Sequence, residues 1–382
     1  MPRATILDQP EEIEKVDRSN MLNHCLNFPD YGKDAIKRAE RIEIRKEVKI
    51  SDRTSITYTT PKNILILGMG GSAIGGELLR GWLRDTLPVP IDICRDHNLP
   101  AYANKDTLVM AISYSGETVE TLSAFVDAIR RRCMTITVTS GGHLLTFSKK
   151  LNIPHVSVPQ NFPPRAAFPY LFFPLPILLT KMKIIPDTRP SAEEALNTLK
   201  SIAEENAPRI PIENNPSKKL ALELKETIPV VYGFRFYEAV AHRMKTQFNE
   251  NSKLPSSYDV FPELSHNEIV GWEASDNLTR GFFITLLRDR DDPPEVNHKI
   301  ELTKALVSRK VRKVHEIYAR GTSRIAKMLS LVVFGDFLSV YLAIALAIDP
   351  SPVKSIQTVK RGMKERFDLT AKLRDEIDNM LS

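Results

Sequence analysis

Short apolar runs recur along the chain, and each is bounded by glycine, proline or polar residues. Their unbroken apolar character is typical of parallel strands that are buried on both faces. In the first half of the chain, these predicted strands are residues 63–67, 91–94, 107–112 and 135–139. Residues 73–83 and 119–132 lie between them and have the spacing of helices. This alternation predicts a doubly wound parallel sheet with right-handed crossovers.

A similar alternation follows in the second half, although no sequence repeat is visible. The predicted strands there are residues 228–233, 281–287 and 311–317, and residues 236–249 are a predicted helix. We therefore expect an α/β fold of two doubly wound subdomains, each with a parallel sheet flanked by helices.

Proline and polar residues from 186 to 216 enclose one helical stretch, residues 191–205, and are typical of a linker. They separate residues 1–185, an N-terminal extension with the first subdomain, from residues 217–382, the second subdomain. The second subdomain also contains a loop, a long apolar helical region and an amphipathic charged region, at residues 289–294, 322–348 and 352–381.

The composition is that of a globular protein, because 382 residues suit two or three domains and 42% apolar residues can fill their cores. Two long apolar stretches, residues 166–185 and 325–348, are interrupted by prolines or by charged residues. We expect them to be buried helices rather than membrane spans. The charged N-terminus lacks the apolar segment of a secretory signal, so we expect a cytoplasmic protein without a membrane partner.

The cysteines and the charge limit the partners of the protein. Cys25, Cys94 and Cys133 are too few and too scattered for a disulfide framework or a zinc site, which predicts a reducing compartment and no metal. The net charge of +6 suits an anionic small substrate, but would also suit weak binding to nucleic acid. The basic runs at 130–132 and 309–313 lack interleaved aromatic residues, so we expect solvated helix faces and no nucleic-acid partner.

A glycine-rich turn follows the first predicted strand and includes Gly68, Gly70, Gly71 and Ser72. Glycines let the backbone approach a ligand closely, and the N–H groups and dipole of the following helix attract an anion. The turn therefore favours a phosphate or sugar-phosphate site. A tight turn with a purely structural role is one alternative.

A dinucleotide site is a second alternative for the same turn. Gly68, Gly70 and Ala73 match the Rossmann fingerprint, and Asp92 follows about one strand–helix–strand unit later, near a strand end. In that case the protein would be an NAD-dependent oxidoreductase, and a fluorescence titration with NADH would detect the cofactor.

A hydroxyl-rich turn, Ser-Tyr-Ser-Gly-Glu-Thr, follows the third predicted strand and precedes another helix. Ser113, Ser115 and Thr118 can aim their hydroxyls at one point in front of that helix. Ordinary helix capping, completed by Glu117 or Glu120, would need just one of the three hydroxyls. The two turns together favour a cup for one phosphate over a dinucleotide site.

The two turns and four later segments resemble a known family. The pairing of GMGGSAIGG with SYSGET is similar to the sugar isomerase (SIS) domain. The rest of the chain resembles the bifunctional phosphoglucose/phosphomannose isomerases, which occur mainly in archaea and some bacteria. The similar segments are NFPPRAAFP, NENSK, ELSHNE and DPSPV, which begin at Asn161, Asn249, Glu263 and Asp349. They span nearly the whole chain, and they imply that both doubly wound subdomains are of the SIS type, each with a parallel five-stranded sheet flanked by helices.

The resemblance implies an isomerase that interconverts glucose 6-phosphate and mannose 6-phosphate with fructose 6-phosphate through a cis-enediol, without metal or cofactor. Such a reaction needs an acid or base for ring opening, a carboxylate base and a fixed cation. By resemblance, Glu250 moves the proton between C2 and C1, and His266 opens the ring. Arg165 steadies the intermediate, because a guanidinium is a permanent cation, and the flanking prolines predict a stiff, extended segment.

The remaining assignments also follow from the resemblance. Lys360 joins His266 in ring opening, although other basic residues stand near it on the same predicted helix. His266 is expected to enter the active site of the other subunit, which makes the homodimer the catalytic unit. A role in glycolysis and gluconeogenesis is implied as well. The substrate is expected to contact Gly70, Gly71, Ser72, Ser113, Ser115, Thr118 and Ser351.

A regulator that senses sugar phosphates through SIS domains, without catalysis, is a third possibility. Such regulators usually carry a fused helix-turn-helix domain, and the first 60 residues are too short and in places too acidic to form one. The chain also departs from the family pattern. It has a polar extension before about residue 45, the 289–294 loop, and the pair Pro163-Pro164 where a single proline is more usual.

Overall fold

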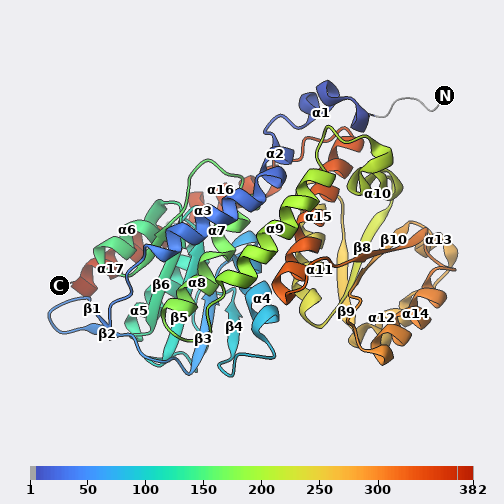
Figure 1. Ribbon diagram of the computed structural model, residues 1–382. Coiled ribbons are helices and arrows are strands. Elements are labelled where there is room, and N and C mark those ends of the chain that lie inside the picture. Colours follow the sequence, from blue (N-terminus) through green and yellow to red (C-terminus); the bar gives the residue numbers. More distant parts are fainter. Residues whose placement is uncertain (1–5, 368, 382) are drawn as a thin grey trace. The chain divides into compact units, whose positions relative to one another are not determined.

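The structure, a computed structural model, describes residues 6–367 and 369–381 (Figure 1). Its described residues form two compact units, and we name each after the sheet that it contains. The first subdomain comprises residues 30–189 with 353–381, and the second subdomain comprises residues 6–29 with 190–352.

This division differs from the contiguous domains that the sequence predicts, because each end of the chain packs on the subdomain that is distant in sequence. The N-terminal helix α2 (Met21–Leu26) contacts α15 (Arg324–Ala345) of the second subdomain. The C-terminal helix α17 (Leu369–Leu381) contacts α5 (Val119–Arg130) of the first subdomain and buries Leu373 and Ile377 there. The apolar faces of the terminal helices thus decide which subdomain they join.

The first subdomain contains the predicted parallel sheet of five strands, in the order β4-β3-β5-β6-β7. Every residue of β5 and β6 is buried, which explains the continuous apolar character of these segments. The strands are β3 (Asn63–Leu67), β4 (Ile91–Cys94), β5 (Thr107–Ser113), β6 (Met134–Thr139) and β7 (His155–Ser157).

The direction of strand addition reverses between β3 and β5 in this sheet. The chain passes from β3 outward to β4, then returns to place β5 on the other side of β3. Right-handed crossovers therefore put α4, after β3, on one face and α5, after β5, on the other. The carboxyl ends of β3 and β5 form the topological switch point, where ligands bind in doubly wound folds.

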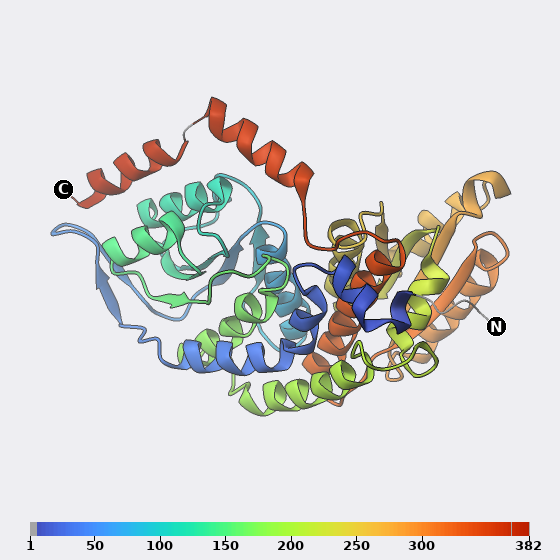
Figure 2. The same cartoon turned by 90° about the horizontal axis from the view of Figure 1, so that it is seen from above.

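Helices cover both faces of the first sheet. Helices α7 and α8 pack on α4, and Figure 2 shows the C-terminal helix α17 (red) running beside α5 on the other side. The helices of this subdomain are α3 (Phe28–Glu40), α4 (Gly71–Leu83), α5, α6 (Gly142–Lys150), α7 (Phe168–Phe172), α8 (Pro174–Lys181), α16 (Lys354–Arg366) and α17. A short antiparallel pair, β1 (Glu47–Lys49) with β2 (Ser55–Thr57), precedes the sheet.

The second subdomain contains a parallel sheet in the order β11-β10-β8-β9, which repeats the strand order of the first sheet without its last strand. The predicted parallel α/β class is therefore confirmed, but the predicted fifth strand is wrong for the residues that the structure describes. After β11 the chain enters the long helix α15 directly, so the sheet gains no further strand. The strands are β8 (Ile228–Phe234), β9 (Ser257–Phe261), β10 (Phe282–Arg288) and β11 (Lys313–Tyr318).

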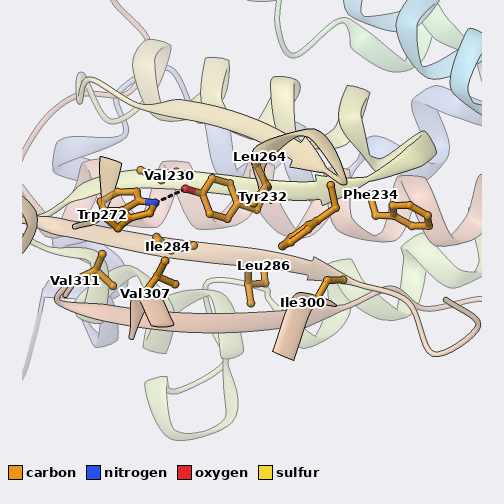
Figure 3. Packing of buried hydrophobic residues seen from close by; sticks show 11 residues of the cluster. Val230, Tyr232, Phe234, Leu264, Trp272, Ile284, Leu286, Ile300, Val307 and Val311 are labelled. Carbon is orange, nitrogen blue, oxygen red and sulfur yellow. Dashed lines mark hydrogen bonds between the residues drawn. The ribbon is translucent and has the colours of Figure 1, made fainter. Parts of the chain in front are cut away.

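One face of the second sheet carries an apolar core of alternating strand residues (Figure 3). Val230 and Tyr232 on β8 point to the same side, as do Ile284 and Leu286 on β10, because strand side chains alternate. Trp272 closes this core and donates a hydrogen bond to the Tyr232 hydroxyl at 2.9 Å.

The other face of the sheet is covered by α11, which packs on β8, β9 and α15. Helix α15 is long and apolar enough to cross a membrane by length and composition, and 89% of its most apolar window is buried inside the structure. This burial agrees with the prediction of a core helix. The helices of this subdomain are η1 (Ile6–Asp8), α1 (Pro10–Val16), α2, α9 (Arg189–Glu205), η2 (Ile212–Asn214), α10 (Pro216–Leu224), η3 (Arg235–Tyr237), α11 (Glu238–Glu250), η4 (Glu263–Ser265), α12 (Glu268–Gly271), α13 (Asp276–Thr279), α14 (Pro294–Val307) and α15.

Candidate active site

The glycine turn lies at the carboxyl end of β3 and leads directly into α4. A Cβ atom added to Gly68 would lie 3.0 Å from the carbonyl carbon of Ser72, so the turn is too tight for a larger residue. Gly70 is the N-cap of α4 with a φ of 50°, and no side chain of the described residues caps this helix. The first turn of α4 thus has no capping side chain among the described residues, as in helix N-termini that bind anions, although the Ser72 and Ala73 N–H groups donate to the Met69 and Gly70 carbonyls.

The hydroxyl turn lies at the carboxyl end of β5, and its side chains bond to one another rather than cap α5. Ser113 Oγ donates to Thr118 Oγ1 at 3.1 Å and accepts from the Gly116 N–H at 3.1 Å. Ser115 is exposed, and its hydroxyl accepts from the Glu117 N–H. Thr118 is the N-cap of α5, yet neither it nor another described side chain caps that helix. Capping therefore does not explain why three hydroxyls are present.

The two turns lie side by side at the switch point. Their strands are neighbours, with Leu67 of β3 paired to Ala111 of β5. Ser72 reaches across to the hydroxyl turn and accepts from the Tyr114 N–H at 3.4 Å. The predicted substrate contacts of the first subdomain therefore form one group.

Arg165 lies against the glycine turn and is buried, with 3% of the residue exposed. A Cβ atom added to Gly71 would lie 3.6 Å from the Arg165 Cα atom. The expected extended segment is wrong, because the Pro163 carbonyl accepts from the N–H groups of Ala166 and Ala167 and closes a turn. Two prolines in succession permit this turn, since the second occupies a position where no N–H donor is required.

The segment before Arg165 is tied to the hydroxyl turn by a tyrosine. The Tyr114 hydroxyl accepts from the Phe162 N–H at 2.8 Å and donates to the Pro159 carbonyl at 3.1 Å. Tyr114, the second residue of the hydroxyl-rich turn, thus fixes the path of the chain toward Arg165. Sequence reasoning assigned Tyr114 no role. Its position between two serines of the hydroxyl turn was the signal that could have indicated one.

Glu250 is the last residue of α11 and is half-buried. The preceding turns of this helix are held to α15 by a buried network around Asp336. Arg243 donates to Asp336 at 2.7 Å, and Gln247 donates to the other carboxylate oxygen at 2.8 Å. One turn later, Asn251 donates to Ser339 Oγ at 2.9 Å. The end of α11 is therefore fixed on a rigid support.

Lys253 brings the Glu250 and Ser351 segments together. Its ammonium donates to the carbonyl of Glu250 at the end of α11 and to the carbonyl of Pro350 at 2.9 Å. Ser351 follows Pro350 directly and is half-buried. Sequence reasoning quoted Lys253 as part of a motif but missed this bridging role, because its partner is distant in the chain.

His266 is exposed and follows the short helix η4. The next two residues hold the segment in place. Asn267 caps α12, and Glu268 accepts from the buried Tyr232 hydroxyl at 3.0 Å, the same hydroxyl that accepts from Trp272. The histidine is thus presented on a short surface segment whose following residues are anchored in the core.

Lys360 lies on α16, a helix whose residues are all exposed in the described structure. The first subdomain therefore carries the glycine turn, the hydroxyl turn, Arg165 and Lys360, whereas the second carries Glu250, Ser351 and His266. Within its subdomain, Arg165 joins the two turns and Glu250 joins the Ser351 segment. Lys360 and His266 are not drawn into these groups by contacts among the described residues.

The dinucleotide alternative depended on Asp92 near a strand end, and the structure shows that this is the amino end. Asp92 is near the amino end of β4, whereas the glycine turn lies at the carboxyl edge of the sheet. Its carboxylate accepts from the Tyr102 hydroxyl at 2.7 Å. A Rossmann acidic residue must stand at the carboxyl end of its strand to reach a ribose, so Asp92 cannot take this role.

The three cysteines, Cys25, Cys94 and Cys133, are free and buried. A search of the described residues for groups of three or more histidine, cysteine, aspartate or glutamate side chains that could hold a metal ion finds no such group.

The fold and the paired turns define a protein of the sugar isomerase (SIS) class. A crystal structure of a glucose-6-phosphate isomerase-like protein from Thermus thermophilus superposes with a TM-score of 0.58, over 93% of this chain and 98% of that one, at 19% identity. This likeness concerns the fold. The family described as the bacterial phospho-glucose isomerase C-terminal SIS domain matches residues 213–363.

Two curated relatives define the family more narrowly. A bifunctional phosphoglucose/phosphomannose isomerase of Caldicellulosiruptor bescii is 38% identical over 91% of this chain and all of its own length. Another from Aquifex aeolicus is 34% identical over 80% of this chain and 92% of its own. The chain therefore belongs to the family of bifunctional phosphoglucose/phosphomannose isomerases.

Proposed function

We propose that this chain interconverts glucose 6-phosphate and mannose 6-phosphate with fructose 6-phosphate. The single observation that carries this proposal is the pair of turns at the switch point of the first sheet, joined through Ser72 and Tyr114. They offer a helix N-terminus without a capping side chain among the described residues, together with three hydroxyls, for one small dianion. The family relationship supports the choice of substrate.

In this proposal the phosphate binds to Ser113, Ser115 and Thr118 and to the first turn of α4, formed by Gly70, Gly71 and Ser72. Hydroxyl and backbone N–H donors fix the phosphate without covering the rest of the sugar. The carbon chain of the sugar, from C5 to C1, can then extend toward the catalytic side chains. Ser351 is proposed to contact the sugar near C2.

Glu250 is proposed as the base that moves the proton. In the open-chain aldose, its carboxylate removes the proton from C2 and the electron pair forms the C1–C2 double bond of a cis-enediolate. Returning the proton to C1 gives the ketose, while a second proton moves between O1 and O2. Arg165 stabilises the negative charge that develops on these oxygens, since a buried guanidinium is a permanent cation that need not reorganise.

Ring opening precedes this proton transfer and is assigned to His266 with Lys360. The imidazole suits proton exchange with the ring oxygen near neutral pH. We further propose a cytoplasmic homodimer in which His266 serves the active site of the other subunit, and a place in glycolysis and gluconeogenesis. Glucose and mannose differ at C2, so accepting both requires rotation about C2–C3 of the open chain or a wide pocket.

A coupled assay with each aldose phosphate tests the proposal, using the native chain and Glu250→Gln. The amide cannot accept the proton, so kcat should fall on the order of a thousandfold with KM little changed. Glu204→Gln, an exposed glutamate near the end of α9, is the matched control and should retain native kinetics. Retained activity in Glu250→Gln would reject the base, and an inactive native chain would reject the function. EDTA in the same assay tests whether a metal is needed.

A further inference from the structure

The hydroxyl turn is backed by a second turn, residues 139–144, which joins β6 to α6. Both turns use glycine in the left-handed region, with φ values of 68° at Gly116 and 65° at Gly142. A Cβ atom on Gly116 would lie 1.9 Å from the Gly141 carbonyl oxygen, and one on Gly142 would lie 2.5 Å from the Ser115 carbonyl oxygen. The two backbones are therefore in direct contact.

Hydrogen bonds to two carbonyl groups of the hydroxyl turn hold this contact. At its start, the Tyr114 carbonyl accepts from the Ser140 N–H at 2.9 Å and from the Ser140 hydroxyl at 2.6 Å. In its middle, the Gly116 carbonyl accepts from the Leu144 N–H at 3.0 Å. The 139–144 turn thus acts as a template for the loop that bears the phosphate-binding hydroxyls.

Glu117 and His143 lock the two turns together. One Glu117 carboxylate oxygen accepts from the His143 N–H at 3.0 Å, and the other lies 2.7 Å from His143 Nδ1. Glu117 therefore caps α6 rather than completing a capping box on its own helix α5. The interaction uses both carboxylate oxygens and fixes the side chain strongly.

An arginine from the C-terminal helix determines the tautomer of this histidine. Arg374 Nη2 lies 3.1 Å from His143 Nε2, and because a guanidinium can only donate, Nε2 must accept. The proton therefore resides on Nδ1 and is donated to Glu117. Helix α17 is docked nearby by the ion pairs Arg130–Glu376 and Lys150–Asp378 and by the buried residue Ile377.

We propose that His143 and Glu117 are positioning residues for phosphate recognition. They hold residues 115–117 against the template turn, so that the hydroxyls of Ser113, Ser115 and Thr118 face one point. Arg374 keeps the histidine in the tautomer that this requires. The inference rests on the phosphate-binding role given to the hydroxyl turn above, but neither His143 nor Glu117 has to touch the substrate.

The test compares native protein, His143→Ala and His143→Asn by calorimetric titration with inorganic phosphate and by steady-state kinetics. His143→Ala should weaken phosphate binding and raise KM about tenfold, with kcat within about twofold of native, because the loss concerns binding rather than proton transfer. His143→Asn should recover most of the affinity, because its Nδ2 can stand where Nδ1 stood and donate to Glu117.

Lys150→Ala is the matched control. It breaks an ion pair between the same two helices, α6 and α17, at the end remote from the phosphate turn, and should leave phosphate affinity native. Unchanged phosphate affinity in His143→Ala would overturn the proposal. Equal losses in the alanine and asparagine variants, or a fall in kcat with unchanged KM, would overturn it as well.

Circular dichroism and thermal unfolding show whether each variant is folded. If His143→Ala does not fold, Glu117→Gln takes its place, and native phosphate affinity in that variant overturns the proposal. The phosphate titration requires no turnover. A native chain without isomerase activity would therefore reject the proposed reaction while the titration still decides the role of His143.

Discussion

The two subdomains contain a similar strand-to-helix turn, but the side chains around it differ, and we proposed an anion site only for the first. Gly68 at the end of β3 and Gly233 in β8 are both too close to the following helix for a Cβ atom. The added atom would lie 3.0 Å from the carbonyl carbon of Ser72 in one case and of Tyr237 in the other. The glycine thus belongs to the packing of strand on helix.

The backbone agreement continues two residues further. Gly70 has a φ of 50° and Arg235 a φ of 51°, so the second subdomain has an arginine with a positive φ where the first has glycine. The side chains then differ, because Ser72 contributes a small hydroxyl where Tyr237 contributes a buried phenol.

The facing turns, which follow the neighbouring strands β5 and β10, differ as well. The carboxyl end of β5 is followed by hydroxyls, whereas that of β10 is followed by Asp289. Asp289 accepts from the Tyr237 hydroxyl at 2.6 Å and from Lys327 at 2.9 Å. Burial alone would raise the pKa of Asp289, but these hydrogen bonds outweigh it and lower the pKa below its usual value. At the switch point of the second subdomain, a carboxylate of the protein itself, that of Asp289, thus lies beside the turn.

The comparison teaches that the turn is a property of the doubly wound fold, and that anion binding depends on a few side chains placed upon it. A glycine-rich turn after a strand is therefore weak evidence for a ligand by itself. The neighbouring strand end decides between a ligand site and an internal contact.

The largest expected effect follows from removing the hydroxyls of the first subdomain. The double variant Ser113→Ala with Thr118→Val loses two donors to a charged group, so kcat/KM should fall about a thousandfold. Arg290→Ala, an exposed change in the facing turn of the second subdomain, is the control and should stay within about twofold of native, because surface changes of this kind have small effects. Comparable losses in both variants would mean that the subdomains do not differ as proposed.

Asp289→Asn tests the internal carboxylate and should destabilise the protein by about 2 kcal/mol at pH 7, because Lys327 loses a buried charged partner. The folded pKa of Asp289 lies below its ordinary value of 3.8. Its contribution is therefore complete above pH 3.8 and is lost as the pH falls through the folded pKa. Urea unfolding should show that the difference in unfolding free energy between this variant and the native protein becomes smaller in acid. Asp291→Asn, whose carboxylate is exposed, should cost about 0.5 kcal/mol or less.

The smallest effect is expected from changing Gly70 and Arg235, the two residues with a positive φ. Gly70→Ala meets no neighbouring atom within 4 Å, so its expected cost of about 1.5 kcal/mol arises from backbone strain, because residues with a Cβ atom rarely adopt φ 50° with ψ −124°. Arg235→Gly relieves the strain of a positive φ but also removes the contact of the guanidinium with the Phe234 ring, so stability should change by less than about 0.5 kcal/mol. Thermal unfolding of both variants measures the two changes in stability. A destabilisation of Arg235→Gly as large as that of Gly70→Ala would contradict this expectation.

The sequence allowed the local features to be predicted well. Continuous apolar runs located β3, β5, β6, β8 and β10, and both phosphate-type turns lie at strand ends as expected. Local signals also explain the errors. Asp92 was predicted near a strand end, but the pattern did not show that this end is remote from the glycine turn, and Ser257–Phe261 has too few apolar residues to be recognised as β9.

Features that depend on distant contacts could not be predicted. The bond between Glu117 and His143 joins residues 26 positions apart, and Lys253 joins a loop that is 97 positions away. Each end of the chain packs on the subdomain that is distant in sequence. The amino-acid sequence gives no signal for this packing beyond the amphipathic character of the terminal helices. Such pairings are decided by the packed fold and not by neighbouring residues.

The docking of α17 on α5 also has a consequence for the order in which the protein can fold during synthesis. The second subdomain has its N-terminal helices from the outset and needs nothing after residue 352. Most of the first subdomain leaves the ribosome earlier, but the side of α5 that contacts α17 stays uncovered until residues 369–381 have been made. The subdomain whose sheet is made first is therefore completed last, and in the interval the side of α5 that later receives α17 is open to chaperones or other nascent chains.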